Sequence, residues 1–237
     1  MQHIKKILEE MRVEEEIRRL LATASPTPSI TPGTEKPESS SIIPGKASLR
    51  SEQEVWMEKV IPAKYRQCSF SNFKGGSGLV KWLTDYATKW PPHSLILSGP
   101  CGAGKTHLAI SILQEQIQHG HWLDIWFVSS PEMLREIKMT YDPDYPLSEA
   151  DVIDKYTEIE FLVIDDLGAE AATDWSISTF YLILDRRHRN DTPTLITTNL
   201  TTQEIEEKLG ARIASRLSEY RTIQLKGIDH RKMTPGQ

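Results

Sequence analysis

A nine-residue segment, GPCGAGKTH at 99–107, constrains the fold more than any other feature of the chain. It fits the phosphate-binding pattern G-x-x-x-x-G-K-[ST]. The apolar run SLILSG (94–99) comes before the loop, and a stretch of helical character, about 104–119, comes after it. Strand, glycine-rich loop and helix in this order form the setting that the pattern requires, so we expect an α/β fold with the loop at a sheet edge.

Further apolar runs of strand length alternate with helical stretches from residue 51 onward. The runs are almost continuously apolar, which is typical of strands buried on both faces of a parallel sheet. We therefore predict an α/β fold: a phosphate-loop parallel sheet covered by helices on both faces. The further strands are expected at DIWFVS (124–129), EFLVID (160–165), TLITTN (194–199) and RTIQL (221–225). The further helices are expected at 131–140, at 175–189 and, as short helices, within 202–218.

The N-terminal part of the chain differs from this body. Residues 1–22 place apolar residues near helical spacing among lysines, arginines and glutamates, and predict an amphipathic arm that binds a partner. Residues 23–50 are rich in Pro, Ser and Thr and predict a flexible linker. Residues 51–237 then form the nucleotide-binding domain. The alternative for the arm is a helix that folds back on its own domain.

Composition limits the classes of protein that remain. The formal net charge is −5, so any contact with nucleic acid must come from a local basic patch. The two cysteines, Cys68 and Cys101, lack metal-ligand pairing and indicate a reducing cytoplasm. No apolar stretch approaches the roughly 20 residues of a membrane span. Glutamates interrupt the first helix, so it does not resemble a signal peptide. We expect a cytoplasmic protein without a membrane partner.

The chemistry of the loop follows from its spacing. Gly99, Gly102 and Gly104 permit backbone angles that turn successive N–H groups toward phosphate oxygens. The helix that follows adds its positive N-terminal end. Lys105 can neutralise the β- and γ-phosphates, and the Thr106 hydroxyl can bind Mg²⁺. The predicted cofactors are therefore ATP and Mg²⁺.

Two carboxylates and one amide follow later strands. The run FLVIDDLG ends in Asp165 and Asp166, which are costly to bury without a cation. We expect Asp165 to hold Mg²⁺ and Asp166 to orient or deprotonate the attacking water. Asn199, at the end of the TLITTN run, can position the same water. The alternative readings are helix-capping acids and ordinary turn chemistry at the Asn.

The segment LGARIASRLSEYR places Arg212 and Arg216 four residues apart on one helical face. The phosphate loop of the same subunit does not need either of them. An arginine in this place can reach the γ-phosphate of a neighbouring subunit as an arginine finger. A salt bridge to Glu206, Glu207 or Glu219 on a solvated face is an equally good explanation.

Together these segments resemble a known family over about residues 58–232. The chain is similar to the helicase-loader family of AAA+ ATPases typified by DnaC, with the transposition ATPase IstB as a close relative. The segments that carry the resemblance are IPAKYRQCSFSNF, GPCGAGKTHLA, LVIDDLG, TTN, RIASRL and GIDHR. The HLA extension after the loop and the R-x-x-x-R-L box make the likeness more specific than a phosphate loop alone.

The resemblance assigns roles to residues of this chain. Asp165 and Asp166 match the Walker B acids, Asn199 matches sensor I, Arg216 resembles the arginine finger, and Arg231 resembles the sensor II arginine. The residues that match the Walker A segment are Gly99, Pro100, Cys101, Gly102, Ala103, Gly104, Lys105, Thr106 and His107.

The resemblance also implies assembly and partners. It implies a homo-oligomeric ring or spiral with ATP between subunits, which delivers a hexameric replicative helicase onto single-stranded DNA. The segment from Ile61 to Phe73 resembles the entry strand and loop that cover the adenine. The chain departs from the common pattern at Asp166, where many AAA+ proteins have Glu, and at His230, where an aromatic residue is frequent. The shorter Asp166 implies slow hydrolysis.

A DNA contact is expected on the helix PEMLREIKMT and the loop after it. Ser129 or Ser130 caps this helix. Arg135 and Lys138 share one face, with Tyr141 and Tyr145 beyond, and cations interleaved with aromatic rings suit a single strand. An ordinary solvated helix followed by a loop explains the residues equally well.

Three functions remain open. The favoured one is an ATP-dependent loader of a replicative helicase. The second is a transposition ATPase that activates a transposase on duplex DNA, against which the net charge of −5 counts. The third is a binding module that uses ATP as a latch and hydrolyses little of it.

Overall fold

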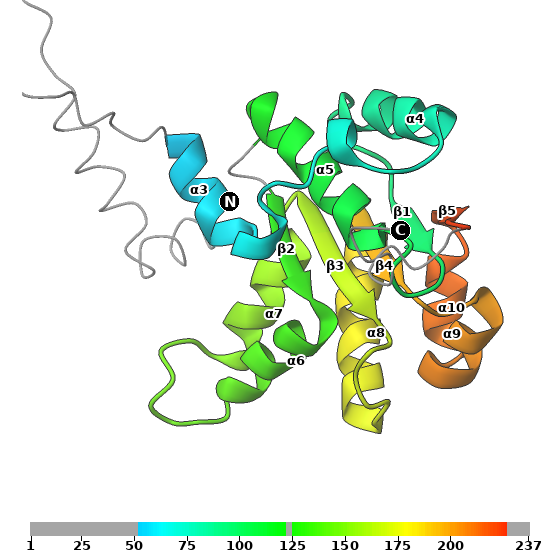
Figure 1. Ribbon diagram of the computed structural model, residues 1–237. Helices are drawn as coiled ribbons and strands as arrows, with labels where there is room; N and C mark the ends of the chain where they lie inside the picture. Colours follow the sequence, from blue (N-terminus) through cyan, green and yellow to red (C-terminus); the bar gives the residue numbers. More distant parts are fainter. Residues whose placement is uncertain (1–51, 122–124, 227–237) are drawn as a thin grey trace, which may run out of the picture.

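A computed structural model gives the fold, and the structure describes residues 52–121 and 125–226. Five parallel strands form one sheet in the order β2-β3-β4-β1-β5 (Figure 1). The strands are β1 (Leu95–Ser98), β2 (Ile125–Ser129), β3 (Phe161–Leu167), β4 (Thr194–Thr198) and β5 (Arg221–Gln224). Each lies where an apolar run predicts it, which confirms the α/β architecture with a parallel sheet.

Helices connect the strands and cover both faces of the sheet, as predicted. Helix α5 follows the loop directly, and the stretch expected within 202–218 forms two short helices. The helices are α3 (Glu52–Val60), α4 (Ser77–Ala87), α5 (Lys105–Gln118), α6 (Ser130–Met139), α7 (Glu149–Glu158), α8 (Asp174–Arg189), α9 (Thr202–Leu209) and α10 (Ala211–Leu217). Two 3₁₀ turns, η1 (Ala63–Tyr65) and η2 (Phe70–Asn72), lie between α3 and α4.

Each face of the sheet has its own hydrophobic cluster, because successive strand residues point to opposite faces. One cluster joins the strands to α3, α4 and α5, and the other joins them to α6 through α10. In Figure 1 the first group of helices lies above the strands and the second below. The strand residues of the first cluster include Leu95, Leu97, Phe161, Val163 and Leu195. Those of the second include Ile96, Leu162, Ile164 and Ile196.

Parts of the chain differ from the expectations. Helices α3, α4 and α7 have no counterpart among the expected elements. Helix α7 begins at Ser148, whose side chain accepts a hydrogen bond from the Asp151 amide in a capping box. The entry strand expected within Ile61–Phe73 is wrong: this segment forms η1 and η2, which begin after Pro62 and Ser69.

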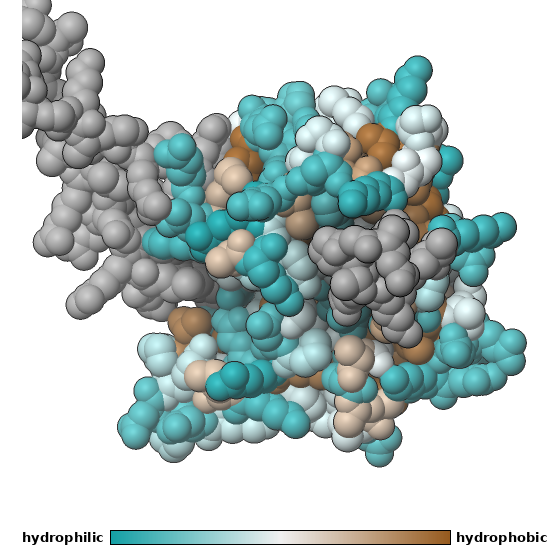
Figure 2. Space-filling model, viewed as in Figure 1, coloured by the Kyte–Doolittle hydropathy of each residue, from teal (hydrophilic) through white to brown (hydrophobic). Residues whose placement is uncertain are grey.

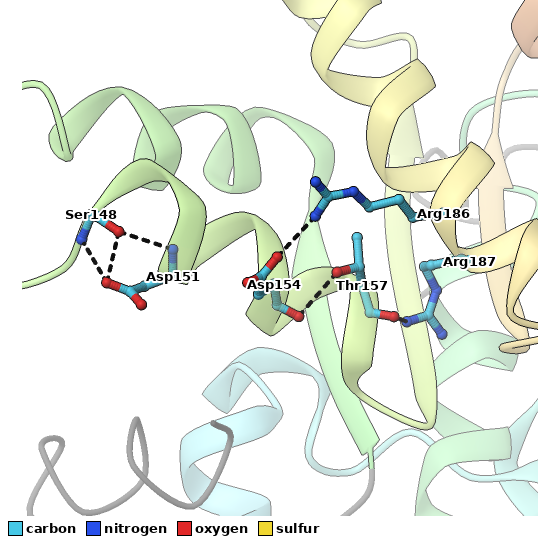
Figure 3. A network of polar contacts seen from close by, with 6 residues as sticks. All are labelled: Ser148, Asp151, Asp154, Thr157, Arg186 and Arg187. Atoms are coloured by element: carbon cyan, nitrogen blue, oxygen red, sulfur yellow. Dashed lines mark hydrogen bonds and ion pairs between the residues drawn. The ribbon is translucent and has the colours of Figure 1, made fainter. Parts of the chain in front are cut away.

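A buried arginine joins α8 to the loops that precede β3 and β4. Arg187 is fully buried, and its guanidinium donates from Nη1 to the carbonyl oxygens of Tyr156 (3.0 Å) and Ile159 (2.8 Å). It also donates from Nε to Thr194 Oγ1 (2.8 Å) and from Nη2 to the Pro193 carbonyl. In Figure 3 Arg187 reaches from α8 toward the end of α7, beside Arg186.

Several expectations concern residues that the structure does not describe. The arm (1–22), the linker (23–50) and Arg231 lie outside the described ranges. Within those ranges, no helix combines the length and apolar character needed to cross a bilayer. The face shown in Figure 2 is mainly hydrophilic, with apolar residues in small separate groups.

Candidate functional site

The loop between β1 and α5 depends on glycine at two positions that pack closely. Gly99 has a φ of 145°, and a Cβ there would lie 2.5 Å from the carbonyl oxygen of Leu225, just after β5. Gly104 has a φ of 88°, and a Cβ there would lie 2.6 Å from Cε2 of Phe73. The glycines therefore permit both the backbone angles and the close approach of neighbouring segments.

Lys105 begins α5 and is buried at 5% exposure. Its Nζ donates hydrogen bonds to the carbonyl oxygens of Gly99 (2.9 Å) and Pro100 (3.0 Å) and to Oδ1 of Asn199. Asn199 follows β4, which pairs with β1 in parallel. The parallel pairing thus brings the lysine of the loop and the amide at the strand end together, as the sequence predicts.

Asp165 lies within the same site, near the end of β3. Its Oδ1 accepts hydrogen bonds from Thr106 Oγ1 (2.9 Å) and from Thr197 Oγ1 (2.6 Å). Burial raises the pKa of Asp165, while the bonds from Thr197 and Thr106 act to lower it. The sequence predicts no role for Thr197. The feature that could identify it as a site residue is a hydroxyl group within a strand whose residues are all buried.

Asp166 is directed to the site by a break in the strand register. The pairing of β3 with β4 shifts between Ile164 and Leu167, and Asp166 has a φ of 56°, which is uncommon for a non-glycine residue. The Asp166 amide donates to Thr197 Oγ1 (2.9 Å), and its carbonyl accepts from Ser130 Oγ (2.9 Å). The neighbouring acids therefore differ: Asp165 binds two hydroxyl groups, whereas the Asp166 residue lines the open pocket.

A cavity of about 280 Å³ collects these groups. Its opposite wall comes from the segment between α3 and α4, which the resemblance places over the nucleotide. His107 joins the two walls, because its Nε2 lies 2.9 Å from the carbonyl oxygen of Ser69 and its ring lies 5.4 Å from the Phe73 ring. The residues that line the cavity are Tyr65, Cys68, Cys101, Gly102, Gly104, Lys105, Thr106, His107, Asp166 and Asn199. Tyr65 and Cys68 belong to the segment Ile61–Phe73 that the resemblance places over the adenine, although the sequence predicts no individual role for either of them.

The two arginines of α10 lie elsewhere. Arg216 donates from Nε to Asp185 Oδ1 on α8 (2.9 Å), and the Arg212 guanidinium lies 5.9 Å from the centre of the Tyr181 ring. Neither arginine is among the residues that line the cavity. The ion pair of Arg216 is thus formed with Asp185, an acid that the sequence alternatives did not include.

The residues that are expected to contact DNA lie in an arrangement that the sequence predicts only in part. Ser129 caps α6, as expected. Lys138 Nζ lies 4.6 Å from the centre of the Trp175 ring, and Trp175 Nε1 donates to the Tyr141 hydroxyl (2.8 Å). Tyr141 is 57% exposed, whereas Tyr145 packs against the second hydrophobic cluster. Trp175 comes from α8, so proximity in sequence could not identify it.

The residues of the cavity fit a nucleoside triphosphate and a hard divalent cation. Helix α5 begins at Gly104 without a side-chain cap, which leaves its first-turn amides open to an anion. By contrast, α6, α7, α8 and α9 each begin at a capping Ser or Thr. Thr106 and Asp165 offer a hydroxyl and a carboxylate oxygen, which are suitable donors for Mg²⁺.

Comparisons with known proteins identify the family of the chain. The family model described as IstB-like ATP binding protein matches residues 81–218, more than half of the chain. The chain is 27% identical to the replicative helicase loader DnaC of Buchnera aphidicola subsp. Schizaphis graminum over 180 residues, 71% of this chain and 72% of the relative. It is 26% identical to the replicative helicase loader DnaC of Escherichia coli K12 over 159 residues, 65% of this chain and 64% of the relative.

Solved structures share the fold at lower identity. A crystal structure of the DnaC helicase loader has a TM-score of 0.61 and 21% identity, with 69% of this chain and 99% of that chain covered. The AMPPCP-bound DnaA of Aquifex aeolicus has a TM-score of 0.58 and 15% identity, with 69% of this chain and 50% of that chain covered. Since the family model covers most of the α/β body, the chain belongs to the IstB-like ATP-binding proteins, within the DnaC/IstB-like AAA+ family.

Proposed function

We propose that this protein is a cytoplasmic, homo-oligomeric ATPase that loads a replicative helicase onto single-stranded DNA. The observation that carries the proposal is the meeting of Lys105, Thr106, Asp165, Asp166 and Asn199 at one edge of the sheet. Relatives named replicative helicase loaders support the choice of substrate.

When bound, ATP supplies the phosphoryl group to be transferred to water, and Mg²⁺ neutralises charge on its oxygens. Backbone amides of the loop after Pro100, from Cys101 to His107, would hold phosphate oxygens, and Lys105 would exchange its present oxygen partners for them. The hydroxyl of Thr106 and the carboxylate of Asp165 hold the cation.

The remaining polar groups of the cavity act on water. Asp166 lines the open space and can accept a hydrogen bond, and finally a proton, from the attacking water at its carboxylate. Asn199 can orient the same water through its amide. Arg216 acts on the neighbouring subunit as an arginine finger, and Arg231 acts as the sensor II arginine of its own subunit.

We expect single-stranded DNA to contact the cluster of exposed Lys138, exposed Tyr141 and half-buried Trp175. The Lys138 ammonium lies over the Trp175 ring, and the Trp175 ring contacts the Tyr141 ring. The ammonium can therefore bind a phosphate while an aromatic ring stacks on a base. Arg135 lies on the same helix and is exposed. Local charge of this kind allows DNA binding by a chain whose net charge is −5.

A transposition ATPase is the second candidate, because the matched family model carries the name of IstB. An ATP-latched binding module with little hydrolysis is the third, since aspartate stands where glutamate is common. These candidates differ in their partner and in their turnover, which makes them separable by experiment.

The test is ATP-dependent loading of the replicative helicase of the same organism onto circular single-stranded DNA. We expect the full-length protein to increase the DNA-bound helicase at least several-fold with ATP, and Lys105→Ala to abolish ATP binding and loading. Lys81→Ala, an exposed lysine on α4, is the matched control and should load normally. Thermal unfolding of both variants checks the fold, because Lys105 also binds loop carbonyls.

Three outcomes contradict the proposal. Tight ATP binding by folded Lys105→Ala would reject the site. Activation of a transposase on duplex DNA without helicase loading would favour the second candidate. Loading with ATP binding but without turnover would favour the latch.

A further inference from the structure

The arginines of α10 are held by one face of α8. Arg216 and Arg212 are one helical turn apart, and their partners Asp185 and Tyr181 are also one turn apart. The two helices therefore form a matched interface in which both cations face α8.

Asp185 is at the centre of this interface. Its Oδ1 accepts from Arg216 Nε at 2.9 Å, and its Oδ2 lies 3.0 Å from Arg189 Nε. The Asp185 side chain is only 13% exposed, whereas the Arg216 side chain is 32% exposed and that of Arg189 is 64% exposed. Asp185 is therefore a largely buried carboxylate whose two oxygens each contact an arginine. Such a carboxylate can hold the more exposed Arg216 side chain in a fixed position.

The contact uses one particular part of the Arg216 guanidinium. A guanidinium group is planar. Its Nε atom lies next to the aliphatic part of the side chain, whereas its two Nη atoms are terminal. Asp185 accepts from Nε and thereby fixes the plane of the guanidinium, and Tyr181 one turn earlier on α8 makes a further hydrogen bond with the Arg216 side chain. The hydrogen bond that Arg216 donates to Asp185 also raises the pKa of Arg216 above its ordinary value, so the group keeps its charge.

We propose that Asp185 is a positioning residue for Arg216: it fixes the guanidinium plane so that the Nη edge meets the γ-phosphate in the neighbouring subunit. The inference rests on the proposed function, in which Arg216 acts on the neighbour's ATP. Displacement of a reacting group by about 1 Å can reduce a rate about 100-fold, so the orientation of the finger matters as well as its presence.

The first experiment measures steady-state ATP turnover by the assembled full-length protein. Arg216→Ala should lower kcat about 1,000-fold. Asp185→Asn should lower kcat between about tenfold and 100-fold with KM for ATP unchanged, because the nucleotide pocket itself is intact. Arg189→Gln removes the other ion pair of Asp185 and should change kcat less than about twofold, since it is exposed.

Mixed assemblies separate positioning from a general loss of structure. Lys105→Ala subunits lack a pocket but supply a finger, and Arg216→Ala subunits lack a finger but supply a pocket, so their mixture should recover turnover. Asp185→Asn placed in the Lys105→Ala subunit should reduce the recovered turnover by the same factor, between about tenfold and 100-fold. The same substitution placed in the Arg216→Ala subunit should leave it unchanged.

The outcomes test separately whether Arg216 acts as a finger and whether Asp185 positions it. Normal turnover by Arg216→Ala rejects the finger and the role of Asp185 with it. Loss in Arg216→Ala together with normal or raised turnover in Asp185→Asn rejects the positioning role alone. The positioning role is also rejected if Asp185→Asn reduces recovery in both mixed arrangements, or in neither of them. Only a reduction confined to the subunit that donates the finger agrees with positioning.

Discussion

At the scale of single residues, adjacent carboxylates in the site have different surroundings. Asp165 accepts hydrogen bonds from Thr106 and Thr197, whereas Asp166 sits at a register shift and lines the cavity. The difference arises from the backbone: one acid lies within the regular β3–β4 pairing and the next lies within the irregularity. Two identical side chains can thereby take separate roles in the proposed reaction.

This difference predicts separate effects of substitution. Asp166→Asn should keep the affinity for ATP and Mg²⁺ and lower turnover by about 100- to 10,000-fold, the usual range for a general base. Asp165→Asn should instead weaken Mg²⁺ binding, because it loses an anionic oxygen. Nucleotide affinity as a function of Mg²⁺ concentration, together with turnover, provides the measurement.

Asp174→Asn is the matched control for this pair, because Asp174 is an exposed acid in the first turn of α8. It should leave both quantities unchanged. Equal loss of nucleotide affinity in Asp165→Asn and Asp166→Asn would show that the roles are wrongly divided.

Some residues of the site could be predicted from the sequence and others could not. The sequence places Lys105 and Thr106 directly after the loop, Asp165 near the end of one strand and Asn199 directly after another. Because parallel strands end at one edge of a sheet, the sequence predicts that these residues lie close together. Asp185 is different. It lies near the end of a helix, and only the packing of α8 against α10 brings it to Arg216.

At the scale of elements, β1, β3 and β4 were predictable because each is a short apolar run that the sheet buries on both faces, whereas β5 is a mostly exposed strand at the edge of the sheet. Helix α7 was missed although its start, Ser148 followed three residues later by Asp151, has the form of a capping box. Its four buried residues, Val152, Ile153, Tyr156 and Thr157, also recur at helical spacing, so the sequence carries the signal of this helix although the segment is short and of mixed polarity.

The anchoring of α8 gives a prediction about stability. Arg187→Met should lower the free energy of unfolding by about 3 kcal/mol or more, because several buried carbonyl oxygens lose their donor, at about 1–3 kcal/mol each. Burial lowers the pKa of Arg187 to about 9, so the group is charged at neutral pH and its bonds are charge-assisted. Urea unfolding measures the change.

The adjacent residue provides the control. Arg186 pairs with Asp154 at 2.8 Å, but the side chains are 40% and 34% exposed, so Arg186→Gln should cost about 0–1 kcal/mol (Figure 3). Similar losses in both variants would mean that surface charge, rather than the buried bonds, accounts for the effect.

At the scale of the whole molecule, we propose that the nucleotide-binding body and the predicted N-terminal arm have separate tasks. The apolar stripe from Ile4 to Leu21 suits helix-in-groove recognition. Lysines and arginines nearly balance the glutamates there, which does not favour a membrane surface. A helix of this length is marginal alone in water, so we expect it to form on its partner. A linker of about two dozen residues reaches roughly 25–30 Å from the body.

Deletion of residues 1–24 should therefore abolish capture of the helicase while ATP affinity stays unchanged, because the cavity-lining residues that the structure describes all belong to the body. A pull-down with tagged full-length and truncated protein measures capture. The matched control keeps the arm and replaces residues 25–50 by a Gly/Ser linker of equal length; it should capture normally, since a flexible tether contributes reach rather than sequence. Undiminished capture by the truncated protein would assign the partner surface to the ATPase body, and loss of capture in the linker control would assign it to the linker.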